Sequence, residues 1–504
     1  RDEQMKNLKI TGIIGFLFQL IFSVVTVVFV IKLNVLPTFY IFWIVFILTL
    51  LLLISGIFII ARSRLRVIIG MVFAFLMSII LAVVSIKYLI PAIGLFNNIT
   101  NPSSTYKTTY HVLVKKDDDA QKLEDIKDYK IGVEKSHDFE AMKKALDNLA
   151  AQFNHTLNVI AYDDYSSMWT AFLGSGETGT ILMDTSFYDI YRNSYEEQDD
   201  DIENYVRILG DIEVEMTRTG SSGETSAATP SGSLTERPFI LYLSGIDVSG
   251  SINTRSRSDV NIIMAVNPST HKILLVTVPR DTYVRFPQTS GFEGTGEQYD
   301  KLTHAAIYGE NDCAVSIATL EQNVYTGIHI DHWIRVNFTS LEKIVDALGG
   351  IEAYSEYSYT SYFTGEEVYF QKGMNYMDGW KALVFCRERK SIPGEEQQRG
   401  RNQLEVVKGI FNKATSPSII VNYNNVLNEI KDNIITDMSM DEITNLIKMQ
   451  IESNASWTFE TASVEVEYVY DYCYSMPSQK LCVGIMDETS RQEAINKINA
   501  VMNG

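Results

Sequence analysis

Three long apolar runs occupy most of the first hundred residues. They cover residues 10–31, 39–61 and 67–86, and none of them contains a charged side chain. A helix needs about 20 apolar residues to cross the ~30 Å hydrocarbon core of a bilayer. A secretory signal peptide has a single, shorter apolar region, so it does not explain three runs. The pattern predicts a membrane anchor of three transmembrane helices within residues 1–100.

Basic residues beside these runs predict the orientation of the anchor, because cytoplasmic loops carry an excess of Lys and Arg. One side of the predicted membrane segment has six basic residues, which are Arg1, Lys6, Lys9, Arg62, Arg64 and Arg66. The other side has only Lys32 and Lys87. We therefore expect a cytoplasmic N-terminus, with the chain from Asn97 onward outside the cell. Because the runs lack charged residues, a transporter or ion pathway is not favoured.

Alternating strand and helix patterns predict two α/β domains outside the membrane. The first shows strands at 130–133, 157–162 and 180–183 and helices at 139–153 and 168–173. We assign residues 101–216 to this small accessory domain. Residues 217–236 are mostly Thr, Ser, Gly, Ala and Pro, a composition typical of a flexible linker. The second domain, with a C-terminal extension, takes up residues 237–504.

The charge distribution argues against nucleic acid as a partner. The chain has 43 Lys and Arg against 62 Asp and Glu, so its net charge is −19. Residues 1–100 contain eight basic and two acidic residues and carry +6, which leaves −25 for the remainder. Nucleic-acid-binding proteins present a basic face to the phosphates, and this acidic outer part does not. Acidic tracts at 117–119 and 196–203 are expected to be solvated loops.

Four cysteines fit an extracellular protein that makes sparse use of disulfides. Cys473 and Cys482 flank a predicted turn at 475–478, so a hairpin is expected there, with or without a disulfide across it. Cys386 lies in an apolar run and is expected to be a buried, small hydrophobic side chain.

Two short motifs have a plainer explanation than a ligand site. Residues 174–179 match G-x-G-x-x-G, but a helix is predicted before the glycines and a strand after them. A dinucleotide site needs the reverse order, so we expect a plain loop. His329 and His332 would point to opposite faces of an extended strand, which makes them a poor metal-binding pair.

Charged residues stand at the ends of three apolar strands in the second domain. The predicted strands are 239–247, 260–266 and 273–278. Asp247 ends the first strand, Arg257 and Asp259 precede the second, and Arg280 follows the third. If the middle strand runs antiparallel to its neighbours, all four side chains gather at one edge of the sheet.

A second group of arginines follows, and it consists of Arg387, Arg389 and Arg399. Arginine grips phosphate oxygens in pairs, so a concentration of arginines in an acidic domain indicates an anion site. Asp247, Asp259 and a loop glutamate would hold Mg²⁺, which takes few carboxylates and completes its shell with water and phosphate. Together they would stabilise a pyrophosphate during transfer. The alternative is ordinary surface ion pairs, Arg257 with Asp259 and Arg387 with Glu388.

These residues and their order resemble the LytR-CpsA-Psr family of bacterial cell-envelope proteins. The resemblance covers about residues 238–415. The matching segments are 245–247, 257–261, 267–268, 278–283, 301–305, 346–351, 378–379 with 382–383, and 387–389 followed by Arg399 and Gln403. Three anchoring helices with an accessory domain are similar to the branch associated with capsular polysaccharide.

The resemblance implies an α/β/α domain with a central mixed sheet and an apolar cleft for a polyprenyl phosphate or pyrophosphate. Family members are understood to transfer an envelope glycopolymer from that lipid to peptidoglycan, with Mg²⁺ assisting. By this resemblance, Asp247 and Asp259 are the magnesium-associated carboxylates. The implied pyrophosphate-binding residues are Arg257, Arg280, Arg387, Arg389, Arg399 and Gln403. Glu396 stands where the family's late loop usually supplies an aspartate.

We therefore predict a membrane-anchored, Mg²⁺-dependent phosphotransferase of a bacterial cell membrane. Arg280 and Arg387 would stabilise oxyanion charge, and Asp259 or Glu396 would act as general base. The expected partners are the polyprenyl-pyrophosphate-linked glycopolymer, the peptidoglycan acceptor, the membrane and proteins of capsule assembly. Two alternatives stay open, a polyprenyl pyrophosphatase and a non-catalytic lipid- or glycan-binding scaffold that regulates assembly.

Overall fold

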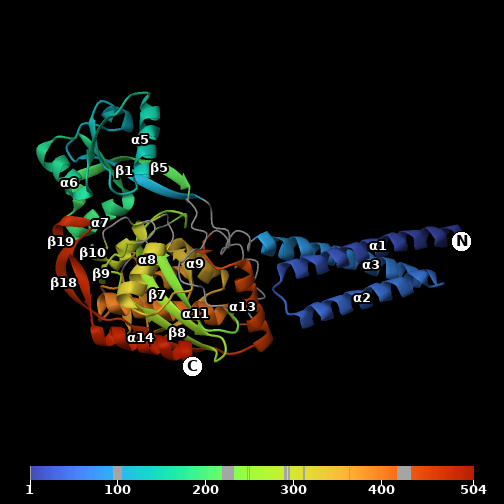
Figure 1. The fold of residues 1–504 in the computed structure, drawn as a ribbon. Coiled ribbons are helices and arrows are strands. Elements are labelled where there is room, and N and C mark those ends of the chain that lie inside the picture. The colour runs from blue at the N-terminus through green and yellow to red at the C-terminus, as the bar shows by residue number, and fades with distance from the viewer. Residues whose placement is uncertain are drawn as a thin grey trace.

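The chain forms a bundle of three long helices followed by two α/β domains, as the computed structural model in Figure 1 shows. The structure describes residues 2–94, 105–217, 232–246, 248, 250–288, 292, 296–309, 313–362, 364–416 and 433–504. Asp247 and most of the predicted linker at 217–236 lie outside the described residues.

The helix bundle supplies the predicted membrane segments. It consists of α1 (Asp2–Leu33), α2 (Thr38–Ile60) and α3 (Arg64–Val84), and α3 continues through a π-helical turn (Ser85–Leu89) to Gly94. All three are long and apolar enough to cross a membrane, which confirms three helices of this kind. Two polar side chains inside the bundle form a hydrogen bond: Ser55 Oγ donates to Gln19 Oε1 at 2.6 Å.

The accessory domain is built on a five-stranded mixed sheet with the order β3-β2-β4-β1-β5. Its elements are β1 (Thr105–Lys115), β2 (Lys130–Glu134), α5 (Phe139–Phe153), β3 (Asn158–Tyr162), α6 (Tyr165–Thr170), β4 (Thr180–Asp184), α7 (Thr185–Glu196) and β5 (Val206–Thr217). The predicted strands β2, β3 and β4 and the predicted helices α5 and α6 are confirmed. The sequence pattern missed β1 and β5, in which polar residues interrupt the apolar ones. Residues 174–179 join a helical segment to β4, so the expected order around the glycines is also confirmed.

A six-stranded mixed sheet forms the centre of the C-terminal domain, with the order β16-β11-β6-β7-β8-β17. Its strands are β6 (Phe239–Ile246), β7 (Ser258–Asn267), β8 (Lys272–Thr277), β11 (His332–Asn337), β16 (Ile435–Thr436) and β17 (Thr458–Ser463). β7 runs antiparallel to both β6 and β8, whereas β11 is parallel to β6 and β17 is parallel to β8. The three predicted strands are confirmed, and so is the antiparallel middle strand.

Helices cover both faces of this sheet, which confirms the α/β/α sandwich. Side chains such as Leu241 and Leu275 pack against α11 (Glu395–Ala414) and α13 (Met440–Ser453). Their neighbours in the strands, such as Tyr242, point to the other face. That face is covered by α8 (Ala314–Thr319), α14 (Glu488–Asn503) and a 3₁₀ segment (Leu302–Ile307).

A separate core lies beside the sandwich. It joins α9 (Phe338–Ala347) and α10 (Gly379–Arg387) to two small two-stranded sheets, β12 (Ile351–Ser355) with β15 (Gly373–Met377) and β13 (Tyr359–Ser361) with β14 (Val368–Phe370). Cys386 is buried in this core at the end of α10, as a hydrophobic side chain would be. Burial raises the pKa of its thiol to about 12.

The accessory and C-terminal domains share one hydrophobic core. Phe187 of α7 packs with Tyr308 of the C-terminal domain, with ring centroids 6.3 Å apart. The backbone also crosses between the domains, since Lys107 N–H donates to Asn253 O and Arg255 N–H donates to Lys107 O, both at 3.0 Å. The two domains therefore present one continuous structure next to the helix bundle (Figure 1).

The predicted hairpin near the C-terminus is present as β18 (Val466–Cys473) and β19 (Met476–Met486). No disulfide links the two strands of this hairpin, because both Cys473 and Cys482 are free. The register explains this result: Cys473 pairs with Met476 at the turn, whereas Cys482 lies opposite Tyr470 farther along the strand. Side chains this far apart in a hairpin cannot be bridged without moving the backbone.

Candidate functional site

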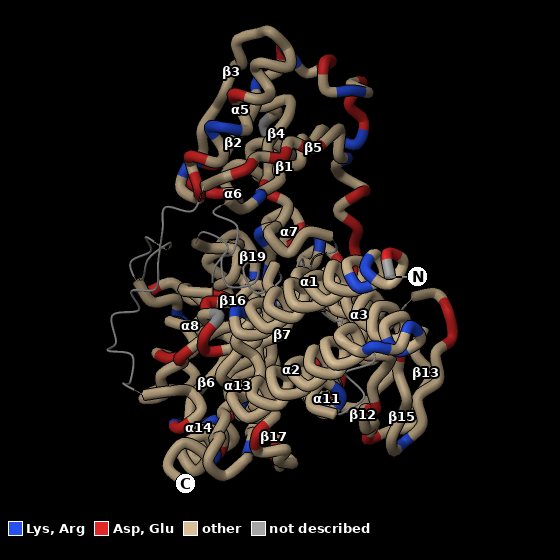
Figure 2. The backbone as a smooth tube through the Cα atoms, turned by 90° about the vertical axis from the view of Figure 1, so that its right-hand side faces the viewer, with Lys and Arg blue, Asp and Glu red and all other residues tan. Residues whose placement is uncertain are grey.

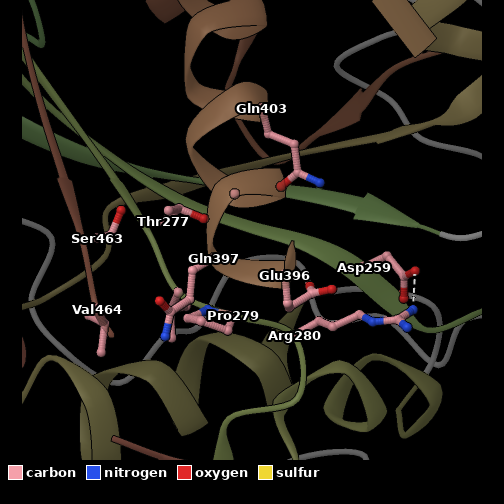
Figure 3. Close-up of a pocket in the computed structure, with 11 residues that line it drawn as sticks. Asp259, Thr277, Pro279, Arg280, Glu396, Gln397, Gln403, Ser463 and Val464 are labelled. Atoms are coloured by element: carbon pink, nitrogen blue, oxygen red, sulfur yellow. Dashed lines mark hydrogen bonds and ion pairs between the residues drawn. The ribbon is translucent and has the colours of Figure 1, made fainter. Parts of the chain in front are cut away.

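The predicted edge of the sheet is where the charged side chains meet. Asp259 lies at the start of β7, and Arg280 follows β8 after a short extended segment. Arg280 Nη1 is 2.5 Å from Asp259 Oδ2, and Thr303 Oγ1 donates to Asp259 Oδ1 at 3.2 Å. The pair is nearly buried, and Asp259 pairs with Arg280 rather than with Arg257, the partner that the surface-pair alternative expected. Figure 3 shows the two side chains joined.

Helix α11 brings the late polar residues to the same edge. Glu396 was expected in a loop, but it lies in the first turn of α11. The chain can start the helix here because Gly394 adopts a left-handed conformation with φ +80°, and acidic residues are favoured in a first turn. Gly400 lets α11 approach β8 closely, since a Cβ at this position would lie 3.1 Å from Thr277 Oγ1. Arg399 reaches back to Glu396 in a buried ion pair.

A small hollow opens between β8, α11 and β17 (Figure 3). It is shallow and open to solvent. Its lining residues are Asp259, Thr277, Val278, Pro279, Arg280, Glu396, Gln397, Gly400, Gln403, Ser463 and Val464. The structure thus brings together Asp259, Arg280, Glu396 and Gln403 from the sequence prediction.

Several arginines surround the carboxylate of Asp259 at this edge of the sheet. Burial by itself would raise the pKa of Asp259, but Arg280, Arg257 and Arg399 together hold it below its ordinary value. Asp281 behaves in the same way, because Lys301 and Arg280 hold its pKa low in spite of its burial. Both carboxylates are therefore ionised at neutral pH.

The other predicted arginines differ in their positions. Arg257 is buried and close enough to Asp259 to lower the pKa of that carboxyl. Arg387 ends α10, with its guanidinium carbon 4.2 Å from the centroid of the Phe338 ring. Arg389 is exposed. Among the described residues that line the hollow, Arg257, Arg387, Arg389 and Arg399 do not appear, so any contact of these four with a ligand stays a prediction.

Sequence reasoning missed a chain of ion pairs that leads away from the hollow. Arg280 Nε lies 3.6 Å from Asp281 Oδ2, and Lys301 Nζ lies 3.2 Å from Asp281 Oδ1. Lys301 Nζ is also 3.2 Å from Glu197 Oε1 of the accessory domain. Glu197 was expected in a solvated acidic loop, but it directly follows α7 and its carboxylate is largely covered. Asp281 could be expected near Arg280 because the two are adjacent in sequence. Glu197 is brought to Lys301 only by the packing of the two domains.

The residues at this edge suit a magnesium ion that is held mainly by phosphate and water. Within the described part of the chain, no group of three or more His, Cys, Asp or Glu side chains is arranged to hold a metal. The buried Glu396 Oε2 has no hydrogen-bond donor in the described structure, so one carboxylate oxygen beside the hollow is available to a cation or a proton. His329 Nδ1 lies 3.0 Å from Glu321 Oε1, whereas His332 Nε2 lies 3.3 Å from Glu442 Oε1, so the two histidines have different neighbours and do not form a metal site together.

Comparison with known proteins gives the same assignment as the residues. The LytR_cpsA_psr family model matches residues 209–494. A polyisoprenyl-teichoic acid–peptidoglycan teichoic acid transferase TagU of Enterococcus faecalis is 32% identical over 239 residues, which cover 47% of this chain and 74% of the relative. The protein of the same name from Bacillus anthracis is 31% identical over 211 residues, which cover 42% of this chain and 64% of the relative.

Solved structures are similar at lower identity. The crystal structure of B. subtilis TagU is 22% identical with a TM-score of 0.39, over 53% of this chain and 98% of that one. TagT bound to LIIa-WTA is 22% identical with a TM-score of 0.44, over 57% of this chain and 100% of that one. The family model spans more than half of the chain, and it confirms the resemblance that the motifs carried. This chain belongs to the LytR_cpsA_psr family.

Proposed function

We propose that the protein is a membrane-anchored transferase that moves an envelope glycopolymer from a polyprenyl-pyrophosphate carrier to peptidoglycan. The glycopolymer would be a capsular polysaccharide or a teichoic-acid-like chain, and capsule-assembly proteins would be partners of the accessory domain. One observation carries the proposal beyond family membership. Three arginines, Arg257, Arg280 and Arg399, act on a single buried carboxylate at the edge of the hollow, which suits a doubly charged phosphate ligand.

In this proposal Arg280 holds the pyrophosphate next to the hollow. Its planar guanidinium can grip two phosphate oxygens, and its burial makes the attraction stronger than it is in water. Asp259 accepts a hydrogen bond from Nη1 at 2.5 Å, and Asp281 Oδ2 lies 3.6 Å from Nε on the other side of the guanidinium. The arginine is thus oriented before the substrate arrives and needs little rearrangement during the reaction.

The reaction would be a displacement at the phosphorus that bears the sugar. A hydroxyl oxygen of the acceptor forms a new P–O bond, the bond from that phosphorus to the bridging pyrophosphate oxygen breaks, and polyprenyl phosphate leaves. The hydroxyl proton needs an acceptor. Glu396 is the better candidate, because its Oε2 is buried without a hydrogen-bond donor, whereas both oxygens of Asp259 already accept bonds.

We propose Mg²⁺ as a cofactor of the same site. Asp259 would be one carboxylate ligand, and Asp247, which lies outside the described residues, would be the second. When bound, the ion would neutralise charge on the pyrophosphate and on the leaving phosphate.

The arrangement of charges supports an outward-facing site. Basic residues gather at the end of the bundle that lies away from the C-terminal domain (Figures 1 and 2). There Lys9 Nζ lies 3.5 Å from Ile60 O, just before Arg62. At the other end, Lys448 of α13 donates to Asn34 Oδ1 at 2.6 Å. By the positive-inside rule the first end would be cytoplasmic, so the C-terminal domain and its hollow would lie outside the cell.

Transfer by the purified full-length protein tests the proposal. Polyprenyl-pyrophosphate-linked glycan and purified peptidoglycan would be supplied with Mg²⁺, and glycan bound covalently to the wall would be measured together with polyprenyl phosphate. Arg280→Ala is expected to lower the rate about 100- to 1,000-fold. Arg285→Ala is the matched control, because Arg285 is a largely exposed arginine of β9 (Tyr283–Arg285), outside the hollow.

Three results would contradict transfer. Release of polyprenyl phosphate at the same rate without peptidoglycan would indicate a pyrophosphatase. Lipid binding without turnover would indicate a scaffold. Equal rates for the Arg280 and Arg285 variants would remove Arg280 from the mechanism.

A further inference from the structure

A row of exposed tyrosines runs along the hairpin of β18 and β19. Tyr468, Tyr470 and Tyr472 are 40%, 58% and 52% exposed. Because side chains alternate along a strand, residues two apart lie on the same face, so the three rings form one line about 13 Å long. We call these three residues the tyrosine stripe. Large exposed rings at regular spacing on a soluble surface point to a binding surface.

The tyrosine stripe is held rigidly to the C-terminal domain. Tyr283 Oη donates to the backbone oxygen of Tyr472 at 2.7 Å, and Tyr474 N–H donates to Tyr299 O at 2.9 Å. On the other strand, Gly484 N–H donates to the backbone oxygen of Asp281 at 2.8 Å. A platform that is already ordered loses little conformational entropy when a ligand binds.

One end of the tyrosine stripe lies beside the hollow. Gln397, which lines the hollow, donates from Nε2 to the backbone oxygen of Val466 at 2.9 Å, two residues before Tyr468. Besides burial, the charges of Glu396 and Asp281 raise the pKa of the Tyr468 hydroxyl. The Gly484 hydrogen bond places β19 directly against the segment that carries Arg280 and Asp281. A linear ligand lying on the stripe would therefore lead to the hollow.

The chemistry of the tyrosine stripe fits a sugar chain. Pyranose rings have apolar C–H faces that stack on aromatic rings, and tyrosine adds a hydroxyl for hydrogen bonds to sugar hydroxyls. The charges near the stripe are of both signs. Lys480 Nζ lies 5.3 Å from the centroid of the Tyr472 ring, Glu396, Asp281 and Arg399 act on Tyr468 at the end beside the hollow, and Glu467 and Asp471 alternate with the stripe on the other face of β18. This surface would not attract a polyanion, such as a teichoic-acid-like chain.

The position of the hairpin indicates that the tyrosine stripe binds the acceptor glycan rather than the lipid-linked donor. Figure 1 shows β18 and β19 on the side of the C-terminal domain that lies away from the helix bundle. A lipid-linked donor comes from the membrane side, whereas a wall polymer reaches the opposite side. We propose that the tyrosine stripe binds the glycan strand of peptidoglycan and leads its acceptor hydroxyl to the hollow. This inference rests on the proposed transferase function.

Binding of the full-length protein to uncrosslinked peptidoglycan glycan strands tests this inference. Replacing Tyr470 and Tyr472 together by alanine is expected to weaken binding about 100-fold, because stacking on one aromatic ring contributes roughly a factor of ten. The double substitution Tyr470→Phe and Tyr472→Phe keeps the rings and should retain most of the affinity. Tyr362→Ala with Tyr369→Ala is the matched control, since both tyrosines are 60% exposed but lie on or beside the separate hairpin of β13 and β14.

Kinetics separates this inference from the proposed function. In the transfer assay, the double alanine variant should raise the KM for peptidoglycan and leave the KM for the lipid-linked donor nearly unchanged. If the wild type transfers glycan and the alanine variant has the same acceptor KM, the stripe is not the acceptor surface and the transferase function stands. If the wild type shows no transfer at all, the proposed function fails. Preferential binding of the stripe to the donor glycopolymer, or to a protein, would also overturn the inference.

Discussion

Replacing Arg255 by methionine should loosen the accessory domain from the C-terminal domain. Arg255 Nη1 lies 2.5 Å from Asp138 Oδ2, and Nη2 lies 3.1 Å from Asp184 Oδ2. Both aspartates cap helices of the accessory domain, α5 and α7, so their carboxylates are fixed where the arginine meets them. Methionine keeps most of the side-chain volume but leaves two carboxylates without their shared cation.

The expected cost follows from the burial of this cluster. The side chains of Arg255 and Asp184 are each 2% exposed, and removing one partner of a buried ion pair costs about 3–5 kcal/mol. A tenfold change in an equilibrium corresponds to about 1.4 kcal/mol, so the undocked state should become roughly 100-fold or more populated. The matched control is Arg285→Met, because Arg285 is 43% exposed and lies 3.9 Å from the exposed Glu297. An exposed pair contributes about 0–1 kcal/mol.

Hydrogen exchange at the interface between the domains measures this effect. The amides of Lys107 and Arg255 donate across the interface, so their exchange should speed up by the same factor of about 100 in Arg255→Met. Arg285→Met should leave them unchanged. Adding Asp138→Asn and Asp184→Asn to Arg255→Met should restore part of the protection, because no unpaired charge then stays buried. Equal exchange in Arg255→Met and Arg285→Met would refute the reasoning.

Three further predictions concern other parts of the structure. Burial, with Arg255 nearby, lowers the pKa of His137 to about 4, so the unfolded chain takes up a proton below pH 6.5 that the folded chain rejects. The free energy of unfolding should therefore be highest above about pH 6.5 and should fall by up to about 3 kcal/mol towards pH 4. Denaturant titrations at several pH values should show this fall, and the fall should be smaller in His137→Phe. Gly400→Leu should push α11 away from Thr277 and lower the free energy of unfolding by about 1–3 kcal/mol. It should also lower the transfer rate more than Gly400→Ala does. An unchanged free energy of unfolding would contradict the close packing of α11 on β8. Lys301→Met removes a cation beside Asp281, so the pKa of that carboxyl should rise towards its ordinary value in a carboxyl-NMR titration; an unchanged pKa would show that Arg280 and Arg399 hold it low without Lys301.

Much of the fold follows from local sequence pattern. The strands β6, β7 and β8 are apolar runs bounded by turn residues, and their antiparallel order was enough to place Asp259 and Arg280 at one edge. The sequence did not indicate that Glu396 starts a helix, because the first two turns of α11 are almost wholly polar and carry no apolar periodicity. The cysteine spacing was compatible with a disulfide, but the register of the hairpin separates the two thiols.

The interactions between domains were beyond sequence reasoning. Arg255 stands two positions from Arg257 and carries the same charge, yet the two side chains serve different partners. Arg255 turns to the carboxylates of the accessory domain, whereas Arg257 acts on Asp259. Glu197 belongs to an acidic tract that resembles a solvated loop, and only the docking of α7 brings it to Lys301. Such pairs depend on contacts between residues far apart in sequence, which periodicity and spacing do not encode.

The central claim is that the arginine cluster binds a polyprenyl-linked phosphate, and lipid analysis of the purified protein tests it most directly. Lipids would be extracted from the detergent-purified full-length chain and identified by mass spectrometry, before and after incubation with polyprenyl pyrophosphate and Mg²⁺. The account predicts about one polyprenyl phosphate or pyrophosphate per protein, lost in Arg280→Ala and kept in Arg285→Ala. Absence of any polyprenyl lipid after incubation, or equal amounts in both variants, would contradict it.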